Sequence, residues 1–403
     1  MAKVSVILPI YNTSQYLHEA LDSVTKQTLK DIEIICINDG SKDNSLNILK
    51  EYSEKDDRII IIDKKNTGYG HSMNTGIDTA TGEYLGILET DDFLSLNMFE
   101  DLYSIAAEND LDTIKADFYR FTRDNEKNMN LKYIKIDRGL DYYNKICVPS
   151  LDALYIQNTR INTWTGLYRL SFLRENNIRH NETPGASFQD NGFFWQVHIY
   201  SKRLMQVNKP YYYCRRDNPN SSTSDKNKVW AMSREYDFIR DILMRDKVIW
   251  NRNKNIYWLN KYWNYNFIIN MIAQEYKYDF FMRMSREFNR ALVLDEISKD
   301  VFSDIEWSNI LIMINNPENY FKENINNNNE IITLKKENIE LKKQITNKQN
   351  ENNRLQRQIK IQNDNFQEEI DNLKLQFTKE HKNLMNQLYI IKNQLNNKEK
   401  TNT

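Results

Sequence analysis

The sequence predicts an α/β fold, a sandwich with a mainly parallel sheet, followed by a helical region and a C-terminal coiled coil. Short apolar and β-branched runs alternate with helical patterns from Lys3 to about Phe121, which is typical of βαβ units. From about Trp230 the chain is rich in aromatic residues, and a heptad pattern begins after Ile325. We therefore expect an α/β domain at residues 1–229, a helical accessory domain at residues 230–325 and a coiled coil at residues 326–403.

Five apolar runs predict the strands of the sheet, and the segments between them predict covering helices. Ser14 is expected to cap a first helix, a second begins near Asp43, and a third runs through Met73 and Ile77 and ends at Gly82. Residues 122–230 are read as the second half of the same domain. The strands are expected at Val4 to Ile10, Ile32 to Asn38, Arg58 to Asp63, Tyr84 to Leu88 and Leu111 to Phe118.

The C-terminal segment is rich in Asn, Lys, Gln and Glu and carries apolar residues at heptad spacing. With Ile331 at position a, isoleucine recurs at a and leucine at d, a pattern that favours a parallel dimer. The phase slips near Phe366 to Ile370, and a helix of this length would reach roughly 100 Å. The alternative is a disordered Asn-rich tail. The residues of the stripe are Leu334, Leu341 and Leu355 at d, and Ile345 and Ile359 at a.

Composition limits the class of partner and the compartment. The formal net charge is −1, so no overall basic field recommends nucleic acid as a partner. The three cysteines, Cys36, Cys147 and Cys214, fit neither a disulfide framework nor a closely spaced zinc site, which favours a reducing cytoplasm. No apolar run reaches about 18 residues, so we expect a cytoplasmic chain and leave a peripheral membrane contact open.

Polar side chains follow three predicted strands, and the carboxyl ends of parallel strands meet at one edge of a sheet. Glu89 and Asp91 are two residues apart, so on extended chain they would point the same way and hold one Mn²⁺ or Mg²⁺ ion. The alternative is that Asp91 or Asp92 caps a helix starting near Leu96.

Asp39 follows the second strand and suggests recognition of a nucleobase. An ionised carboxylate only accepts hydrogen bonds, so it suits uracil, thymine or guanine, which present a ring N–H, better than cytosine. The alternative is an Asx-turn or a cap for the helix near Asp43.

The first strand with Pro9-Ile10-Tyr11-Asn12, the Asn38-Asp39-Gly40-Ser41 turn and the Glu89-Thr90-Asp91-Asp92 stretch together resemble family 2 glycosyltransferases, over about residues 3 to 225. The resemblance implies a GT-A fold, with Pro9 and Tyr11 lining the nucleoside pocket, Asp39 on the base and Asp91 on the metal. The family usually has aspartate where Glu89 stands and often arginine where Met73 stands. The loop residues Asn66, Gly68 and Asn74 resemble the stretch that approaches the donor.

The segment Ser187 to Phe194 resembles the acidic motif of the family, in which an aspartate removes the proton of the acceptor hydroxyl. The resemblance assigns this role to Asp190, with Gln189 in place of the usual glutamate; the alternative is a turn or cap residue. Tyr213 to Ser222 resembles the segment near the diphosphate, where Arg215 or Arg216 would meet phosphate.

The predicted function is that of an inverting glycosyltransferase of the hexosyltransferase class. It would move a sugar from a UDP-sugar to a hydroxyl of a glycan or lipid-linked glycan acceptor, such as a lipooligosaccharide, a capsule or another surface polysaccharide. The alternative is an inert coiled-coil scaffold, which the departures at Glu89 and Gln189 keep open. A sugar-phosphate nucleotidyltransferase or a Rossmann dehydrogenase would need a glycine-rich loop after the first strand, and Pro9 to Asn12 is not one.

Overall fold

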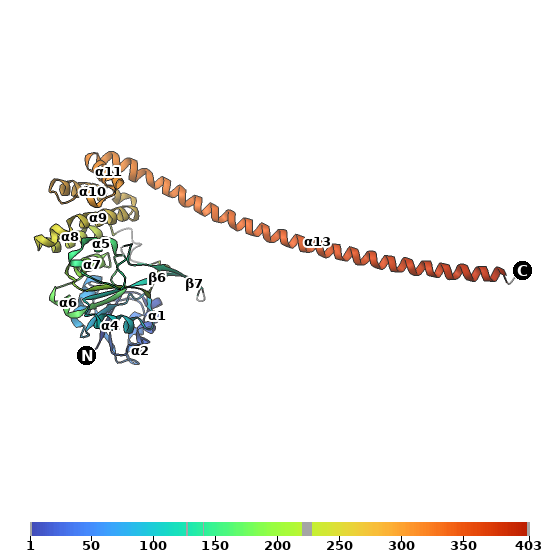
Figure 1. Cartoon of the computed structure of the whole chain (residues 1–403), viewed down its shortest axis with the longest axis horizontal. Coiled ribbons are helices and arrows are strands. Elements are labelled where there is room, and N and C mark those ends of the chain that lie inside the picture. Colours follow the sequence, from blue (N-terminus) through green and yellow to red (C-terminus); the bar gives the residue numbers. More distant parts are fainter. Residues whose placement is uncertain (1, 126–127, 140, 220–227, 401–403) are drawn as a thin grey trace. The chain divides into compact units, whose positions relative to one another are not determined.

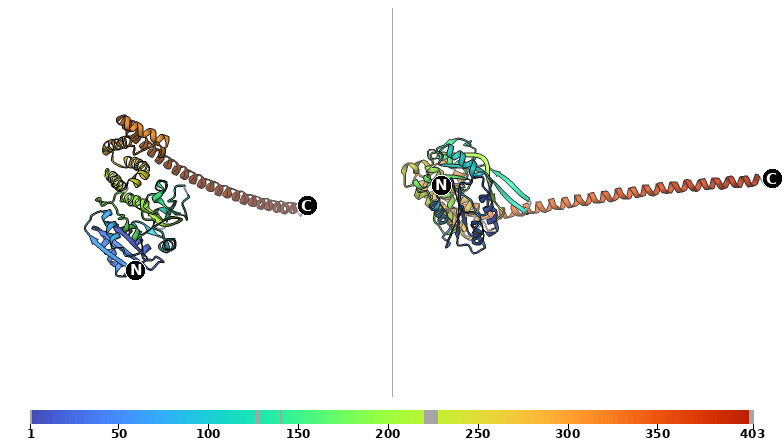
Figure 2. Two further views of the ribbon diagram at one scale, coloured as in Figure 1. Left: turned by 60° about the vertical axis from the view of Figure 1, so that its left-hand side comes forward. Right: turned by 90° about the horizontal axis from the view of Figure 1, so that it is seen from below.

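The structure is a computed structural model that describes residues 2–125, 128–139, 141–219 and 228–400. It divides into two compact units, Met1–Pro317 and Glu318–Thr403. The first unit contains the α/β sandwich together with the helices that follow it, and Figures 1 and 2 show its elements.

The first unit is built on a 10-stranded mixed sheet with the order β3-β2-β1-β4-β9-β6-β10-β5, in which β7 pairs with β6 and β8 with β10. The first four strands of this order are parallel, and β6 and β10 are parallel further along. The predicted mainly parallel sheet is therefore confirmed. The strands are β1 (Val4–Ile10), β2 (Ile32–Asp39), β3 (Ile59–Lys64), β4 (Tyr84–Ile87), β5 (Phe93–Leu94), β6 (Thr113–Asn125), β7 (Asn128–Ile134), β8 (Ile146–Cys147), β9 (Gly166–Arg169) and β10 (Leu204–Arg215).

Helices cover both faces of the sheet because alternate strand residues are apolar and buried on each face. One core joins β1 and β2 to α1 (Ser14–Thr25), α2 (Ser45–Ser53) and α4 (Met98–Glu108). The other joins Ile7, Ile35 and Ile37 to α3 (Tyr69–Thr79), α6 (Leu170–Glu175) and α7 (Gln189–Tyr200). The predicted sandwich of two helical layers around the sheet is thus present.

The start of α1 differs from the prediction. Ser14 is the first helical residue and not the cap, and the side chain of Thr13 at the cap position makes no capping bond. Instead the Ser14 N–H donates to Asp43 Oδ2 at 2.9 Å, and the Thr13 N–H donates to Ser45 Oγ at 3.3 Å. The loop after β2 therefore caps the helix after β1, a pairing that only the folded sheet creates.

Helices follow the sandwich from Ala231 onward and lie one after another beyond α7 (Figures 1 and 2). Their interior holds Lys261, whose ammonium lies 2.9 Å from Glu287 Oε2 and over the rings of Trp258 and Tyr265. Burial lowers the pKa of Lys261 against the opposing pull of Glu287. The helices are α8 (Ala231–Leu243), α9 (Lys247–Met271), α10 (Gln274–Val293) and α11 (Asp304–Asn315); the shorter η1 (Pro149–Leu151), α5 (Ala153–Asn158) and η3 (Lys299–Val301) complete the unit, and α12 (Pro317–Tyr320) spans its boundary with the second unit.

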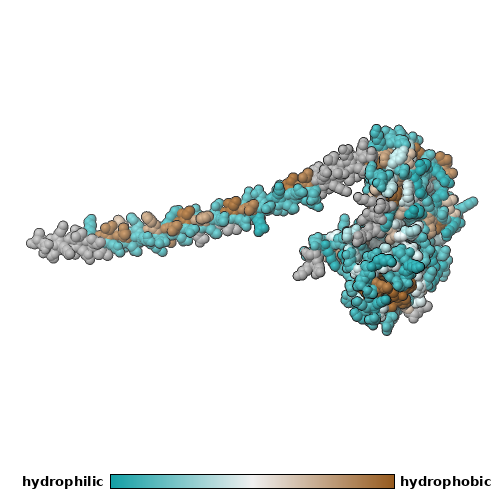
Figure 3. All heavy atoms as spheres, turned by 180° about the vertical axis from the view of Figure 1, so that it is seen from behind, coloured by the Kyte–Doolittle hydropathy of each residue, from teal (hydrophilic) through white to brown (hydrophobic). Residues whose placement is uncertain are grey.

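The second unit consists of a π-helical turn, η4 (Phe321–Asn326), and the long helix α13 (Asn327–Lys400). The predicted C-terminal helix is thus confirmed. Apolar side chains recur along α13 (Figure 3), and Leu341, Ile345, Leu355 and Ile359 are each more than half exposed. No helix in the described part of the chain is long and apolar enough to cross a membrane.

Candidate functional site

A cavity of about 670 Å³ lies at the carboxyl ends of β1, β2 and β4, where an open α/β sheet binds ligands. Strand ends, the 66–69 loop, the start of α7 and the end of β10 all contribute to its wall. The predicted site residues that line it are Pro9, Tyr11, Asp39, Asn66, Gly68, Glu89, Asp91, Asp190 and Arg215.

Asp39 at the end of β2 organises the loop that follows β3. Its carboxylate accepts hydrogen bonds from the backbone N–H groups of Thr67 and Gly68, each at 2.9 Å, and pairs with Lys64. Asp39 does not cap α2, because Asn44 stands at the cap position and Asp43 Oδ1 accepts the Ser45 N–H at 3.0 Å. A carboxylate has about four acceptor positions, so three bonds leave room for one further donor from a base.

Gly40, the next residue, makes this arrangement possible. Its φ is +71°, in the left-handed region that favours glycine, and a Cβ there would lie 2.9 Å from the backbone nitrogen of Asn66. Asp39 and the 66–68 loop can therefore approach only with glycine at position 40.

The Glu89-to-Asp92 stretch is a turn, so the expected extended conformation is wrong. The Asp92 N–H donates to the Glu89 carbonyl at 3.1 Å, which closes the turn immediately after β4. Both Glu89 and Asp91 nevertheless line the same cavity. Neither Asp91 nor Asp92 caps the next helix, because α4 begins at Met98 with Asn97 at its cap position.

Burial, the Tyr69 hydroxyl and two negative charges set the protonation state of Glu89. The Tyr69 hydroxyl donates to Glu89 Oε1 at 2.7 Å, and the Glu89 N–H donates to the Tyr212 hydroxyl at 3.0 Å. Burial, reinforced by the charges of Asp91 and Asp190, raises the pKa of Glu89 to about 7, although the Tyr69 bond opposes the shift. Glu89 therefore binds a proton near neutral pH unless a cation compensates its charge.

Asp190 lies in the first turn of α7 and faces the cavity. The residue before the helix, Phe188, has φ +66°, a strained conformation for a bulky side chain. Burial raises the pKa of Asp190, and hydrogen bonds from Asn191 oppose that shift. A carboxylate with a raised pKa is a stronger base, as removal of a proton from a hydroxyl requires.

Gln189 holds the loop before α7 and is only 1% exposed. Its Nε2 donates to Thr183 Oγ1 at 2.9 Å and to the Gly185 carbonyl at 3.1 Å, while its Oε1 accepts from the Ser187 N–H at 2.5 Å. These bonds use both ends of the amide, so Gln189 shapes the wall of the cavity.

Arg215 supports the Glu89-to-Asp92 turn from behind. Its side-chain Nε donates to the Asp91 carbonyl at 2.8 Å, and its backbone N–H donates to Asp92 Oδ1 at 2.7 Å. Its guanidinium also pairs with Glu19 and with Asp217. Arg216 also lines the cavity. Asn220, Ser221 and Ser222, which belong to the same predicted segment, lie outside the described residues.

Asn74 does not line the cavity. Its side chain donates to the His180 carbonyl at 3.0 Å and to Glu182 Oε1 at 2.9 Å, and it accepts from the His180 N–H at 2.8 Å. Asn74 therefore joins α3 to the 180–182 segment. Sequence reasoning missed the lining residues Tyr69, Thr163 and Lys228, which carry no motif of their own, and did not single out Asn218 within the Tyr213 to Ser222 segment.

The two carboxylates fit a divalent cation as part of its shell. Asn218 donates to Asp91 Oδ2 at 2.8 Å and Tyr69 to Glu89 Oε1, so these bonds leave the second oxygen of each carboxylate available among the described residues. Within the described ranges no group of three or more His, Cys, Asp or Glu forms a ligand cluster. An ion here would take its remaining oxygen ligands from water or phosphate, as Mg²⁺ commonly does.

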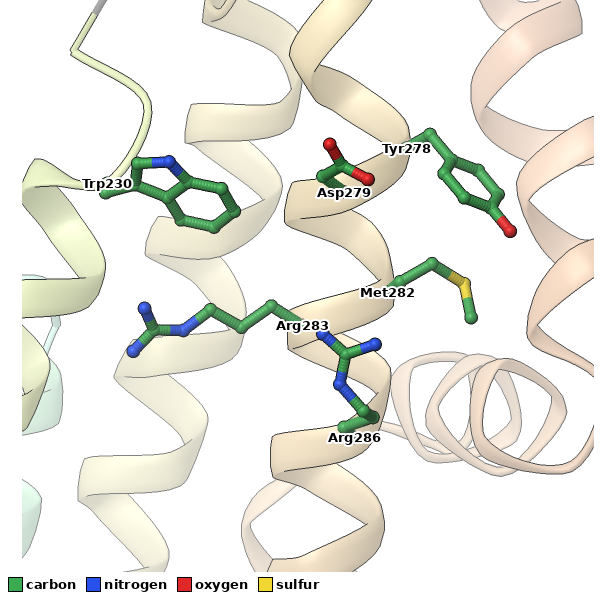
Figure 4. Close-up of a pocket in the computed structure, with 6 residues that line it drawn as sticks. All are labelled: Trp230, Tyr278, Asp279, Met282, Arg283 and Arg286. Atoms are coloured by element: carbon green, nitrogen blue, oxygen red, sulfur yellow. The ribbon is translucent and has the colours of Figure 1, made fainter.

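A second depression, of about 450 Å³, lies on the helical region (Figure 4). Trp230 and Tyr278 lie on opposite sides of α10 in Figure 4, so the lining side chains do not converge on one point. Arg283 is already paired with Asp237 at 2.8 Å and Glu287 at 2.6 Å. The cavity at the strand ends is therefore the candidate catalytic site.

Comparison with known proteins agrees with this location. Residues 5–194 match the family model described as Glycosyl transferase family 2, and this range contains the three strand ends and Asp190. The uncharacterized glycosyltransferase EpsJ of Bacillus subtilis is 32% identical over 224 residues, which is 55% of this chain and 62% of EpsJ. The glycosyltransferase GlyA of Streptococcus pneumoniae is 33% identical over 217 residues, which is 52% of this chain and 30% of GlyA. The chain therefore spans less than two thirds of these relatives.

The fold is also that of a solved structure. The crystal structure of S. aureus TarS 1–349 in complex with UDP superimposes with a TM-score of 0.54 at 20% identity, covering 71% of this chain and 80% of that chain. At this identity the similarity concerns the fold, and it confirms the predicted GT-A-like α/β architecture.

Proposed function

We propose that this chain, which carries a glycosyl transferase family 2 domain, transfers a sugar from a UDP-sugar to a hydroxyl group of a glycan acceptor with inversion at the anomeric carbon. One observation carries the proposal: Asp39, the Glu89 and Asp91 pair, and Asp190 line a single cavity although they come from three separate parts of the chain. Different carboxylates would then bind the nucleobase, hold the cation at the diphosphate and accept the proton of the acceptor hydroxyl.

The donor end of the cavity is assigned to Asp39, Pro9 and Tyr11. Asp39 keeps an acceptor position for the ring N–H of uracil, and the half-exposed Tyr11 ring stands at the rim for the nucleoside. The TarS structure described in complex with UDP agrees with this donor. Asp91, with Glu89, would hold Mn²⁺ or Mg²⁺, which supplies positive charge to the leaving diphosphate when bound.

The acceptor end is assigned to Asp190. Its carboxylate would accept the proton of the acceptor hydroxyl as that oxygen attacks the anomeric carbon, and attack opposite the leaving diphosphate inverts that centre. The raised pKa of Asp190 favours this proton transfer. The acceptor class proposed is a surface glycan or a lipid-linked glycan, and the work would take place in the cytoplasm, with a peripheral membrane contact.

We also propose that α13 pairs with α13 of a second copy as a parallel coiled coil. Its exposed apolar stripe, with isoleucine at a and leucine at d, is what supports a homodimer. The catalytic domain would then be presented in two copies.

Calorimetric titration of the full chain with UDP in the presence and absence of Mn²⁺ tests the donor site. Asp91→Ala should remove the Mn²⁺-dependent part of the affinity, because a ligand of the cation is lost. Asp57→Ala, which removes an exposed carboxylate outside the cavity, should leave UDP binding unchanged. Equal Mn²⁺-dependent binding by Asp91→Ala and wild type would refute the metal assignment.

A further inference from the structure

The amino end of α7, which carries Asp190, lacks a cap from its own chain segment. Phe188 occupies the cap position in a left-handed conformation and provides no side-chain hydrogen bond. The first four N–H groups of a helix have no acceptor within the helix, so a buried start without a cap is unfavourable.

Glu235 on α8 adds an acceptor to the first turn of α7 from the helical region. Its Oε1 accepts the Gly192 N–H at 2.7 Å, and its Oε2 accepts from Asn181 Nδ2 at 3.0 Å. The Glu235 residue is 1% exposed, so these bonds form away from competing water. One carboxyl group thus joins α8, the start of α7 and the 181 segment.

The approach of the two helices depends on Gly192. A Cβ at this position would lie 2.5 Å from Glu235 Oε1 and 2.8 Å from the ring of Phe238, closer than real contacts allow. Position 192 therefore has to be glycine for the side chain of Glu235 to reach the backbone of α7.

The same carboxyl group connects the two halves of the candidate site. Asn181 packs against α3, where a Cβ on Gly70 would lie 2.0 Å from the Asn181 carbonyl oxygen, and α3 follows the donor loop directly. The two groups are also linked electrostatically, because the charge of Asp190 adds to burial in raising the pKa of Glu235. The link from Glu235 to Asp190 is direct, through the backbone of α7, whereas its link to the donor loop runs through Asn181 and α3.

We infer that Glu235 is a positioning residue for Asp190: it holds the first turn of α7 from α8 and so makes the helical region a working part of the catalytic unit. This inference rests on the proposed function. It assigns no contact between Glu235 and either substrate, because Glu235 does not line the cavity. Its effect is transmitted through the backbone of Gly192, two residues after Asp190.

Steady-state transfer kinetics and UDP calorimetry on the full chain test this inference. Glu235→Ala should lower kcat between about 10-fold and 100-fold, since a displacement of about 1 Å near the reacting atoms costs up to about 100-fold. The Kd for UDP should stay within about twofold of wild type, because the donor-side carboxylates are untouched. Glu235→Gln keeps an oxygen that accepts from Gly192 N–H and should restore most of kcat.

Glu296→Ala is the matched control, since Glu296 is a buried carboxylate of the same helical region that pairs with Arg240 instead of α7. It should keep the wild-type kcat. The inference is overturned if Glu235→Ala keeps the wild-type kcat, if Glu235→Gln fails to restore it, or if UDP binding falls in parallel with kcat. Should Glu235→Ala not fold, Glu235→Asp, one methylene shorter, replaces it in the same comparison.

The failure of this inference is distinguishable from failure of the proposed function. If the wild type transfers no sugar, the proposed function fails before any variant is compared. If the wild type is active and Glu235→Ala is equally active, only the positioning role fails.

Discussion

Neighbouring groups give each carboxylate of the cavity a different chemical character. Asp39 accepts from two backbone N–H groups and Lys64 and keeps room for one further donor, Glu89 is paired with the Tyr69 hydroxyl, and burial raises the pKa of Asp190 against the bonds from Asn191. Hydrogen bonds favour the charged form of a carboxylate, whereas burial disfavours it. These surroundings match a base-binding acceptor, a cation ligand that charges when the ion arrives, and a proton acceptor.

Glu235 makes stability depend on pH. Burial raises its pKa from 4.5 to about 8 in the folded protein, so between these values the folded state binds a proton more tightly than the unfolded state. Stability from this group is complete below about pH 4.5 and is lost as pH rises through about 8. Each unit of pKa shift corresponds to about 1.4 kcal/mol of unfolding free energy, so the stability lost over this pH range is a small multiple of that amount.

Thermal unfolding of the ligand-free protein between pH 5 and 8 checks this expectation. The Tm of wild type should fall more steeply with rising pH than the Tm of Glu235→Gln, which cannot titrate. Equal slopes for the two proteins would show that Glu235 does not titrate in this window.

The local sequence was sufficient to predict the site residues at the strand ends, but it could not predict the side chains that contact them. Asp39, Asp91 and Asp190 were predicted because they follow recognisable strands or a motif, and all three line the cavity. Glu235 and Tyr69 were missed, because their importance comes from contacts with α7 and with Glu89 that no spacing encodes.

Among the elements, the start of α7 is held by contacts with other segments that its own helix propensity does not indicate. Its start combines a left-handed Phe188, a hydrogen bond to Glu235 on α8 and a glycine that admits the Glu235 side chain. Secondary structure was predictable where apolar periodicity was strong, as in β1 and α3. The turn at Glu89 to Asp92 was read as extended chain because its closing bond joins backbone atoms and leaves no side-chain signature.

Gly192→Ala tests the fit between α7 and α8. The added methyl group would collide with Glu235 Oε1 and the Phe238 ring, and overpacking of this kind typically costs about 1 to 3 kcal/mol. We expect a lower free energy of unfolding by urea denaturation. Adding Phe238→Ala, which removes one of the two clashing groups, should recover part of the loss; an unchanged stability in Gly192→Ala would contradict the close approach.

On the scale of the whole molecule, the α/β sandwich and helices α8 to α11 share one compact unit, and α13 belongs to the other. The candidate catalytic site thus lies in the first unit, and the helix proposed to form the dimer lies in the second. The exposed stripe on α13 has no covering partner among the described residues of its own unit, and burying apolar surface against a second copy would offset that exposure.

Light scattering of the full chain measures the predicted dimer. Leu341→Glu with Leu355→Glu should convert a dimer to a monomer, because two d positions would then place charges in the seam. Asn350→Glu with Asn353→Glu adds the same charge at exposed positions outside the seam and should leave the dimer intact. A wild-type monomer, or a dimer that survives the leucine substitutions, would contradict the coiled coil. Transfer per active site should be the same in all three proteins.

The most direct measurement is release of UDP from a panel of UDP-sugars by the full chain with Mn²⁺ and a mixture of glycan acceptors. The wild type should release UDP from at least one donor in step with sugar transfer. Asp190→Asn should bind UDP normally and lose transfer by at least about 100-fold, since a general base contributes about 10²- to 10⁴-fold. No UDP release from any donor by wild type, or undiminished transfer by Asp190→Asn, would contradict the account.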